Sequence, residues 1–371
     1  MRIAQVAPLY ESVPPKFYGG TERVVSYLTE ELVRQGHDVT LFAAGDSRTR
    51  ARLVCSCPSA LRLEAGCVDR MSHHMVLVDQ VYERADEFDV IHFHIDYLHF
   101  PTSRRLRRPR VTTLHGRLDI PDLESLYKRF RHEPVISISN AQRSPLPWLA
   151  WRGNVYHGLP DDFLSFHAER GQYLAFLGRI SPEKRVDRAI EIARKTGWTL
   201  KIAAKIDQAD REYHEQHIEP LLGTSGVEYV GEIGEREKDA FLGNAAALLF
   251  PIDWPEPFGL VMIEALACGT PIIAWCCGSV PEIVEQGETG FICKSLDEAV
   301  RAVNRLPSLS RARCRQAFET RFLASRMAAD YVRVYEQLIE RTDMQDVGVP
   351  HHGRDHYRSE PVLHSGDVLA R

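Results

Sequence analysis

Residues 1–44 read MRIAQVAPLYESVPPKFYGGTERVVSYLTEELVRQGHDVTLFAA, and this stretch decides the fold. Two short apolar runs, residues 2–8 and 38–44, predict strands. The segment between them has apolar residues at helical spacing: Val24, Val25, Leu28 and Leu32. We expect Thr21 to cap this helix and Gly36 to end it. A strand, a helix and a strand in this order form a βαβ unit, whose parallel sheet is covered by helices on both faces.

The same pattern continues through the first half of the chain. Apolar runs at residues 89–94, 110–115 and 134–139 predict three further strands, and each ends in polar side chains. The carboxyl ends of parallel strands face the ligand crevice in open α/β sheets. We therefore expect these polar residues to cluster at one rim of the sheet: His92, His94, His115, Ser139 and Asn140.

A second series of strands and helices begins near residue 171, and a chain of 371 residues is long enough for two domains. The predicted strands cover residues 173–178, 199–204, 227–230, 246–251, 271–275 and 290–293. The predicted helices cover residues 186–196 and 258–268. We place the first domain at residues 1–165, the second at 166–315, and a helix that returns to the first domain at 316–340. The polar tail, 341–371, is expected to be loosely ordered.

Composition excludes several classes of function. The formal net charge of −5 argues against a bulk polycation that binds nucleic acid. No apolar run reaches the ~20 residues of a membrane-spanning helix, and the chain starts with a strand pattern, not a secretory signal. We therefore expect a cytoplasmic protein, monomer or homodimer, with at most peripheral membrane contact. The eight cysteines lack zinc-site spacing and are expected to be buried free thiols in a reducing compartment.

The strongest functional signal is residues 254–271, WPEPFGLVMIEALACGTP. Glu256 lies between two prolines and must therefore lie on a loop. Phe258 and Gly259 then open a helix whose free N–H groups would face the crevice and could bind a diphosphate. Glu256 would accept hydrogen bonds from sugar hydroxyls. Glu264, roughly 7.5 Å further along the helix, could reach a ribose diol. The alternative is a capping loop before a core helix, with a glutamate favoured by the helix dipole.

A second signal, residues 178–185 (GRISPEKR), follows the first strand of the second half. Arg179 and Lys184 could stabilise the charge that grows on a departing nucleoside diphosphate. The chain contains no Asp-x-Asp pair to hold a divalent ion, so cations and a helix dipole are expected to act without a metal or cofactor. The alternative is a solvated loop with Ser181 as a helix cap and Pro182 at the first helical position.

Three weaker signals remain. The segment Tyr18-Gly19-Gly20-Thr21-Glu22 would let backbone approach a phosphate or sugar, although a plain tight turn fits equally well. His115, at a strand end, could donate to the sugar or support the reacting centre, or be structural. His92 and His94 have no matching carboxylate, so we read them as rim or core residues and not as metal ligands. The five arginines of residues 103–110 form a solvated loop or a site for an acidic lipid or anionic acceptor.

These motifs resemble the retaining glycosyltransferases of family 4, which have the GT-B architecture of two Rossmann-like domains facing across a cleft. The resemblance covers nearly all of residues 1–340. The stretch 18–46 is similar to a bacterial subgroup that includes a UDP-glucose:tetrahydrobiopterin glucosyltransferase. The family often has Gly where this chain has Arg185.

The resemblance implies a donor site made by both domains. Arg179 and Lys184 would bind the diphosphate, while Glu256 would contact the sugar hydroxyls and Glu264 the ribose. The amides of Phe258, Gly259 and Leu260 would hold sugar and phosphate. From the first domain, Gly19 and Gly20 would approach the diphosphate, and His115 would lie beside the donor sugar.

The resulting hypothesis is a metal-independent, retaining transfer of a hexose from a nucleotide sugar to an unidentified acceptor. The resemblance favours UDP-glucose as donor. A nucleotide-sugar epimerase, a sugar phosphorylase and a non-catalytic nucleotide-sugar binding protein are the alternatives. An NAD oxidoreductase is disfavoured, because no glycine fingerprint follows the first strand.

Overall fold

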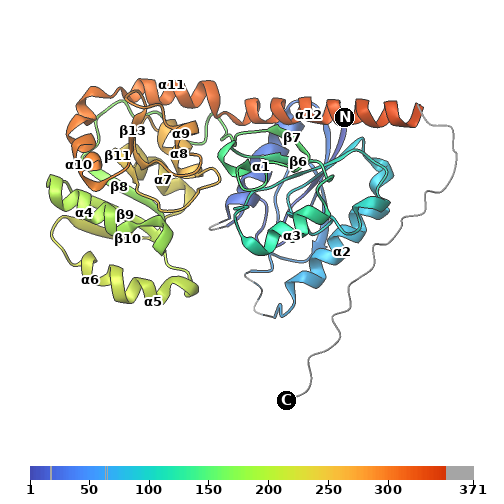
Figure 1. The fold of residues 1–371 in the computed structure, drawn as a ribbon, viewed down its shortest axis with the longest axis horizontal. Coiled ribbons are helices and arrows are strands. Elements are labelled where there is room, and N and C mark those ends of the chain that lie inside the picture. The colour runs from blue at the N-terminus through green and yellow to red at the C-terminus, as the bar shows by residue number, and fades with distance from the viewer. Residues whose placement is uncertain (17–18, 63, 65, 348–371) are drawn as a thin grey trace, which may run out of the picture.

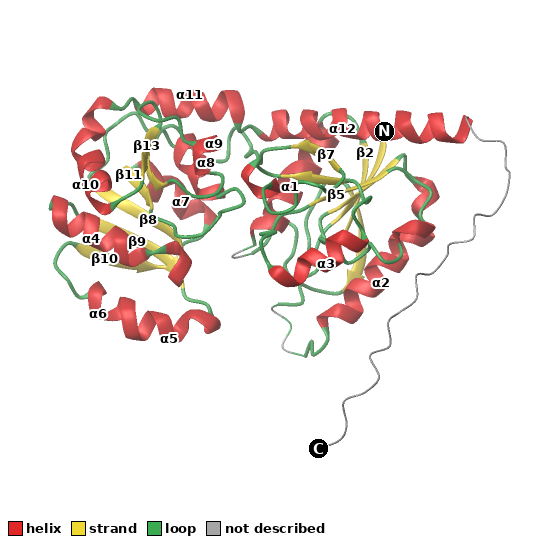
Figure 2. Cartoon of the chain, viewed as in Figure 1, coloured by secondary structure: helices red, strands yellow, loops and turns green. Residues whose placement is uncertain are grey.

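The apolar runs of the sequence form two separate parallel sheets in the computed structural model, which describes residues 1–16, 19–62, 64 and 66–347. Figure 1 shows the two α/β domains side by side, and Figure 2 shows helices flanking the strands of each. The predicted fold class, two Rossmann-like domains facing across a cleft, is confirmed.

The N-terminal sheet has the strand order β3-β2-β1-β4-β5-β6-β7. Its strands are β1 (Arg2–Val6), β2 (Asp38–Ala44), β3 (Arg52–Cys57), β4 (Val90–Phe93), β5 (Arg110–Thr113), β6 (Val135–Ser137) and β7 (Trp151–Asn154). Its helices are α1 (Gly20–Arg34), α2 (Arg70–Glu83) and α3 (Pro121–Arg129). Short 3-10 turns cover Ala85–Glu87, Ser103–Arg105 and Ala141–Arg143.

The C-terminal sheet has the order β10-β9-β8-β11-β12-β13. Its strands are β8 (Tyr173–Arg179), β9 (Leu200–Lys205), β10 (Val227–Gly231), β11 (Ala245–Phe250), β12 (Ile272–Trp275) and β13 (Gly290–Cys293). The helices of this half are α4 (Val186–Thr196), α5 (Arg211–Tyr213), α6 (Glu219–Leu222), α7 (Glu235–Gly243), α8 (Leu260–Ala267), α9 (Val280–Ile283), α10 (Leu296–Arg305) and α11 (Arg311–Arg321). Shorter helical turns cover Pro182–Lys184, Gln208–Asp210, His214–Ile218 and Leu306–Ser308.

Each sheet buries both faces, as the near-continuous apolar strands require. In the N-terminal domain, α2 packs on one face through Leu77 and Val81. The opposite face is covered by α1, through Leu28, and by α12 (Ala324–Val347). In the C-terminal domain, α7, α8 and α11 cover one face and α4 and α10 cover the other. The central strands therefore have no solvent-facing side, and only their ends are accessible to a ligand.

The predicted strands are confirmed to within a few residues, but β3 and β7 were not predicted. Both lie at the edges of the N-terminal sheet. Edge strands are buried on fewer sides, and both sequences, RLVCSC and WRGN, mix polar with apolar residues. Their weak apolar pattern explains the omission.

The prediction that Thr21 caps α1 is wrong. The helix begins at Gly20, two residues earlier than a cap at Thr21 would require, and Gly19 is its N-cap without a side-chain hydrogen bond. A Cβ on Gly19 would lie 2.8 Å from Pro15 Cβ, so close approach of the preceding loop requires glycine here. At the other end, Gly36 has a φ of 86° and follows the helix, as predicted.

The helix predicted over residues 316–340 is two helices. Residues Arg311–Arg321 form α11 on the C-terminal domain, and α12 begins at Ala324 and lies along the N-terminal domain (Figure 1). The break allows Leu323 to pair with Leu159 of the interdomain linker in a short parallel bridge. The return to the first domain is as expected, but α12 runs to Val347, beyond the start of the predicted tail. The rest of that tail, 348–371, lies outside the described residues.

Candidate active site

Both sheets turn their topological switch points toward one cleft. The strand order reverses between β1 and β4 in the first sheet and between β8 and β11 in the second. Ligands of open α/β sheets bind at such points, outside the carboxyl ends of the strands. Residues at or beyond the carboxyl ends of these four strands line a cleft of about 1230 Å³, among them Tyr10, His94, Arg179 and Trp254.

The N-termini of α1 and α8 face each other across this cleft. A Cβ on Gly20, the first residue of α1, would lie 3.8 Å from Cδ1 of Leu260, the first residue of α8. The first N–H groups of a helix have no partner within the helix, and its dipole is positive at this end. Two such termini at one place create a site suited to a polyanion.

Glu256 lies on the loop between β11 and α8, as its neighbouring prolines predict. Its Oε2 accepts hydrogen bonds from Lys184 Nζ at 2.5 Å and from Trp254 Nε1 at 3.1 Å. The backbone N–H of Ser279 donates to the Glu256 carbonyl at 3.0 Å, which fixes the loop from the side of α9. A carboxylate of this kind, buried but lining the cleft, can accept hydrogen bonds from ligand hydroxyls.

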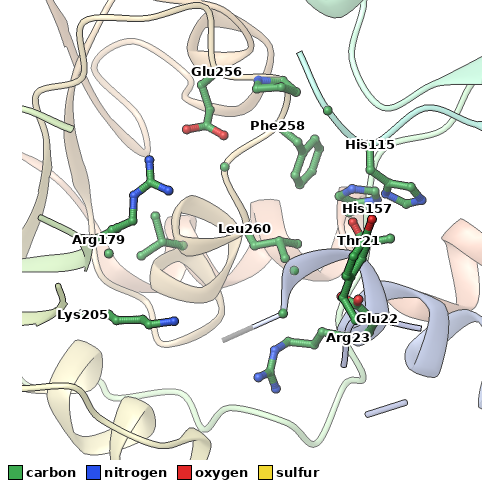
Figure 3. A pocket seen from close by; sticks show the side chains of 18 of the residues that line it. Thr21, Glu22, Arg23, His115, His157, Arg179, Lys205, Glu256, Phe258 and Leu260 are labelled. Atoms are coloured by element: carbon green, nitrogen blue, oxygen red, sulfur yellow. The ribbon is translucent and has the colours of Figure 1, made fainter. Parts of the chain in front are cut away.

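Arg179, the last residue of β8, and Lys184, in the turn that follows, both reach the cleft, and each is paired with at least one carboxylate. Arg179 forms ion pairs with Glu183 and, at 3.2 Å, with Asp210. Lys184 lies beside Glu256 and 4.8 Å from the centre of the Trp254 ring. Figure 3 shows Arg179 and Glu256 pointing into the same space. The structure therefore brings together the two motifs that the sequence separates by more than seventy residues.

Arg185 adopts the backbone conformation that a glycine would supply. Its φ of 53° and ψ of 51° are left-handed, which costs a non-glycine residue about 1 kcal/mol. Its guanidinium binds Asp187 at 2.7 Å and Asp253 at 2.9 Å, and these ion pairs offset the cost. The turn that presents Lys184 is thus formed without the glycine common in the family.

Glu264 is 2% exposed and lies on the first turns of α8. Its Oε1 accepts a hydrogen bond from Lys238 Nζ of α7 at 2.7 Å. A buried carboxylate keeps its charge only when a cation or donors compensate it. Lys238 supplies that compensation, and both residues line the cleft.

The histidines predicted to share one rim divide into two groups. His94 and His115 line the cleft, and His115 Nε2 lies 2.9 Å from His94 Nδ1. His92 is fully buried on the face covered by α12, so its prediction as a rim residue is wrong and its core alternative is correct. Burial lowers the pKa of His115 to about 3, so its ring is neutral at physiological pH.

Ser139 and Asn140 do not join the cleft histidines. Ser139 is buried, and its hydroxyl accepts from the backbone N–H of Gln142 at 3.1 Å. Asn140 lies at the domain boundary, where its backbone N–H donates to Glu282 of the second domain at 2.8 Å. The predicted cluster therefore reduces to His94 and His115.

Among the cleft residues that sequence reasoning missed are Asp96, Lys205 and His157. Lys205 ends β9 and Asp96 follows β4, so the strand-end rule could have found both. Asp96 has a left-handed φ of 49°, and burial raises the pKa of its carboxyl to about 6. His157 belongs to the interdomain linker and stacks on His115 with 5.4 Å between ring centres (Figure 3). No local pattern marks a residue of that kind.

Within the described ranges, no group of three or more His, Cys, Asp or Glu side chains is arranged to hold a metal ion. All eight cysteines are free. Cys57, Cys268, Cys293 and Cys314 are buried as predicted, whereas Cys55 and Cys276 are exposed and Cys67 and Cys277 are half-buried. The prediction of buried thiols is therefore wrong for half of them.

The arginines of residues 103–110 lie away from the cleft. Arg108 pairs with Asp86 at 3.0 Å and Arg110 with Glu133 at 3.1 Å, while Arg104, Arg105 and Arg107 are exposed. Among the residues described, no helix combines the length and the apolar character needed to cross a bilayer. Tyr18, at the start of the glycine segment, lies outside the described residues.

Two α/β domains with facing switch points, opposed helix N-termini and a cation–carboxylate pair at the cleft have the arrangement of a GT-B glycosyltransferase. Comparison with family models agrees: residues 18–152 match Glycosyltransferase Family 4, and residues 161–320 match Glycosyl transferases group 1. The chain is a glycosyltransferase, and each of its two domains is similar to one of these family models.

Relatives with known names are distant but extend over most of the chain. The glycogen synthase of Mycobacterium tuberculosis is 28% identical, over 85% of this chain and 89% of its own length. The alpha-maltose-1-phosphate synthase of Mycolicibacterium smegmatis is 24% identical, over 79% and 84%. Among solved structures, a glycosyltransferase involved in avilamycin A biosynthesis is 25% identical, with a TM-score of 0.69 over 92% of this chain and 98% of that one.

Proposed function

We propose that this glycosyltransferase transfers glucose from UDP-glucose to an acceptor hydroxyl, with retention of anomeric configuration and without a metal. The observation that carries the proposal is the convergence of Arg179, Lys184 and the N-terminus of α8 on one cleft. Anabaena HepE, a structure with the same fold at 18% identity, holds UDP-glucose.

The diphosphate would lie between the two helix N-termini. The backbone N–H groups at Gly259 and Leu260 would bind it from one side, and those at Gly19 and Gly20 from the other. Arg179 and Lys184 would exchange their present carboxylate partners for phosphate oxygens, to which charge-assisted hydrogen bonds are strong. Once these two side chains have left their carboxylate partners, their positive charge would neutralise the diphosphate. The reaction would then need no divalent ion.

The glucose would lie beside Glu256 and Phe258, and the ribose beside Glu264. When Lys184 moves to the phosphate, Glu256 Oε2 becomes available to sugar hydroxyls while Trp254 Nε1 still orients it. Lys238 Nζ donates to Oε1 of Glu264, and the second oxygen of this carboxylate would accept hydrogen bonds from the diol.

The reaction would follow a front-face course. The bond from the anomeric carbon to the diphosphate oxygen breaks while the bond to the acceptor oxygen forms on the same face. The departing phosphate oxygen accepts the acceptor's proton, so the protein supplies positioning and charge stabilisation and not a strong base. His115, neutral and at the edge of the cleft, would contact the reacting sugar.

The acceptor would occupy the N-terminal part of the cleft, near Tyr10, Arg62 and Met71. Tetrahydrobiopterin is the first acceptor to test, because residues 18–46 resemble the subgroup that glucosylates it. A panel of sugar and polyol acceptors should accompany it.

The test starts with donor binding. UDP-glucose should raise the melting temperature more than UDP-galactose, GDP-mannose or ADP-glucose do, since a ligand stabilises the state that it binds. EDTA should leave this shift unchanged. Turnover is then followed by proton NMR of the anomeric signal, which should show an α-linked product from the α-linked donor.

Other results would point elsewhere. A β-linked product would overturn retention, and loss of binding in EDTA would overturn metal independence. Conversion of the donor without an acceptor would indicate an epimerase, and a requirement for inorganic phosphate would indicate a phosphorylase. Donor binding with no turnover across the acceptor panel would favour a binding protein.

A further inference from the structure

A continuous series of buried hydrogen bonds joins His115 in the cleft to the helix α12. His115 Nε2 contacts His94 Nδ1 at 2.9 Å, and His94 Nε2 contacts Gln5 Oε1 at 2.8 Å. Gln5 Nε2 then donates to the hydroxyl of Tyr335 at 3.1 Å. Gln5 and Tyr335 are 0% exposed and His94 is 2% exposed, so water does not compete for these groups.

The series continues beyond Tyr335 to a second tyrosine of the same helix. The Tyr335 hydroxyl lies 2.7 Å from His92 Nδ1, and His92 Nε2 lies 2.7 Å from Thr113 Oγ1. Thr113 Oγ1 lies 3.0 Å from the Tyr331 hydroxyl. Buried polar side chains destabilise the fold unless each of them is hydrogen-bonded. Apolar side chains at these positions would therefore have formed a simpler core. The network therefore calls for a role beyond packing.

The geometry at Tyr335 fixes the direction of these bonds. The distance of 3.1 Å to Gln5 Nε2 fits an N–H donor, and the distance of 2.7 Å to His92 fits an O–H donor. Gln5 thus turns its amide toward Tyr335 and its carbonyl toward His94. His94 must donate from Nε2 to that carbonyl, and because burial lowers its pKa well below the usual range, its Nδ1 is an acceptor.

We propose that Tyr335 is a positioning residue for His115: through Gln5 and His94 it holds the proton of His115 on Nε2 and leaves Nδ1 as the hydrogen-bond acceptor that a cleft ligand can address. In a neutral imidazole, the hydrogen bond made by one ring nitrogen decides which nitrogen carries the proton. His115 would then accept a hydrogen bond from a sugar or acceptor hydroxyl and could not donate one through its ring. The catalytic consequence rests on the proposed function, whereas the tautomer does not.

The helix α12 connects this hydrogen-bond network to the linker between the two domains. Arg326, near its start, donates to the carbonyls of Tyr156 at 2.8 Å and His157 at 3.1 Å in the interdomain linker. The same helix then carries Tyr331 and Tyr335 over the N-terminal sheet. The helix that leaves the C-terminal domain thus positions His115 in the N-terminal domain.

The test is a long-range proton–nitrogen NMR spectrum of enzyme labelled with ¹⁵N-histidine at pH 7.5, in which His115 is assigned by its absence from the His115→Gln spectrum. The wild type should show His115 as the Nε2–H tautomer. In Tyr335→Phe, Gln5 loses its acceptor, and His115 should shift toward a mixture of tautomers. Turnover should fall roughly tenfold with little change in the KM for donor.

Tyr331→Phe is the matched control, because Tyr331 is equally buried on the same helix but lies at the far end of the network. It should keep the wild-type spectrum of His115. Gln5→Met breaks the network without changing α12 and should reproduce the effect of Tyr335→Phe if that variant folds poorly.

Three outcomes would overturn the proposal: an Nδ1–H tautomer in the wild type, an unchanged His115 spectrum in both Tyr335→Phe and Gln5→Met, or the same change in Tyr331→Phe. Since the spectrum needs no substrate, an inactive wild type with the expected tautomer would contradict the proposed function alone.

Discussion

Lys184 Nζ lies 2.5 Å from Glu256 Oε2, and this contact joins the segment after β8 to the loop before α8. The two residues are partners in the structure without ligand, and each would bind a different part of the donor: phosphate for the lysine and sugar for the glutamate. The contact holds both side chains at the cleft before the donor arrives, which lowers the cost of ordering them on binding.

Loss of either partner should affect transfer far more than folding. We expect Lys184→Ala and Glu256→Gln each to lower kcat by on the order of 10²-fold or more, because each removes a fixed group from the developing charge or the reacting sugar. Lys195→Ala, which breaks an exposed pair with Glu191 on α4, is the control and should keep wild-type turnover. Near-wild-type activity of Lys184→Ala would remove the lysine from the mechanism.

Gly278 should be indispensable to the Glu256 loop. A Cβ there would lie 2.3 Å from the Glu256 carbonyl oxygen and 2.4 Å from its backbone nitrogen, and its φ is 55°. We therefore expect Gly278→Ala to displace the loop, with large losses of both melting temperature and donor binding. Gly197→Ala is the matched control, since its φ is also positive, at 70°, but no atom lies within 4 Å. It should cost only about 1 kcal/mol and leave donor affinity unchanged; equal effects would refute the steric argument.

Lys238→Met should destabilise the C-terminal domain, because it leaves the carboxylate of Glu264 buried without its cation. Removing one partner of a buried pair costs about 3–5 kcal/mol, which corresponds to a fall of roughly 10 °C in melting temperature for a domain of this size. Lys201→Met removes the partner of the exposed Glu228 and should change the melting temperature little.

The double variant Lys238→Met/Glu264→Gln tests whether the unpaired carboxylate of Glu264 causes the loss of stability. It should recover much of the lost stability, since no buried charge remains, but it should still bind donor weakly. If the double variant is as unstable as Lys238→Met, the loss comes from packing of the lysine side chain and not from the unpaired carboxylate.

Buried histidines should make the protein sensitive to acid. Burial lowers the pKa of His115 to about 3 and lowers the pKa values of the others well below 6.5: His92, His94, His99 and His157. Between pH 6.5 and about 3 the unfolded chain therefore binds protons that the native state does not. Their stabilisation is complete above pH 6.5 and is lost as pH falls, by up to about 1.4 kcal/mol per pH unit for each histidine. Asp96, with its pKa raised to about 6, acts in the opposite sense between pH 4 and 6. Burial also raises the carboxyl pKa values of Glu11, Glu22 and Asp210, but the five histidines outnumber these four groups.

Melting temperatures between pH 7.5 and 5.0 measure this dependence. His99→Gln should reduce the number of protons taken up on unfolding by one. The variant should still fold, because the glutamine amide can donate to Thr112 Oγ1, which His99 Nε2 contacts at 2.7 Å. His132→Gln, on the exposed surface, should leave the pH dependence unchanged. A wild-type melting temperature that stays constant down to pH 5.0 would show that the buried histidines do not resist protonation.

The sequence by itself determined the two parallel sheets, most strand and helix positions and the residues at the carboxyl ends of β5, β8 and β11. These features depend on local patterns: apolar runs with polar ends, helical spacing and prolines beside Glu256. Since parallel strands align their carboxyl ends, such patterns are enough to place His115, Arg179 and Glu256 around one cleft.

Only the tertiary structure decided what surrounds these residues. It placed His92 under α12 and not at the rim, gave Arg185 a left-handed conformation held by Asp253, and divided the final helix at Phe322 and Leu323. The contact between His92 and Tyr335 spans 243 residues and arises because one helix crosses from the second domain to the first. No periodicity in a chain encodes such a contact, because it depends on how whole domains pack and on which polar groups remain to be satisfied once they do.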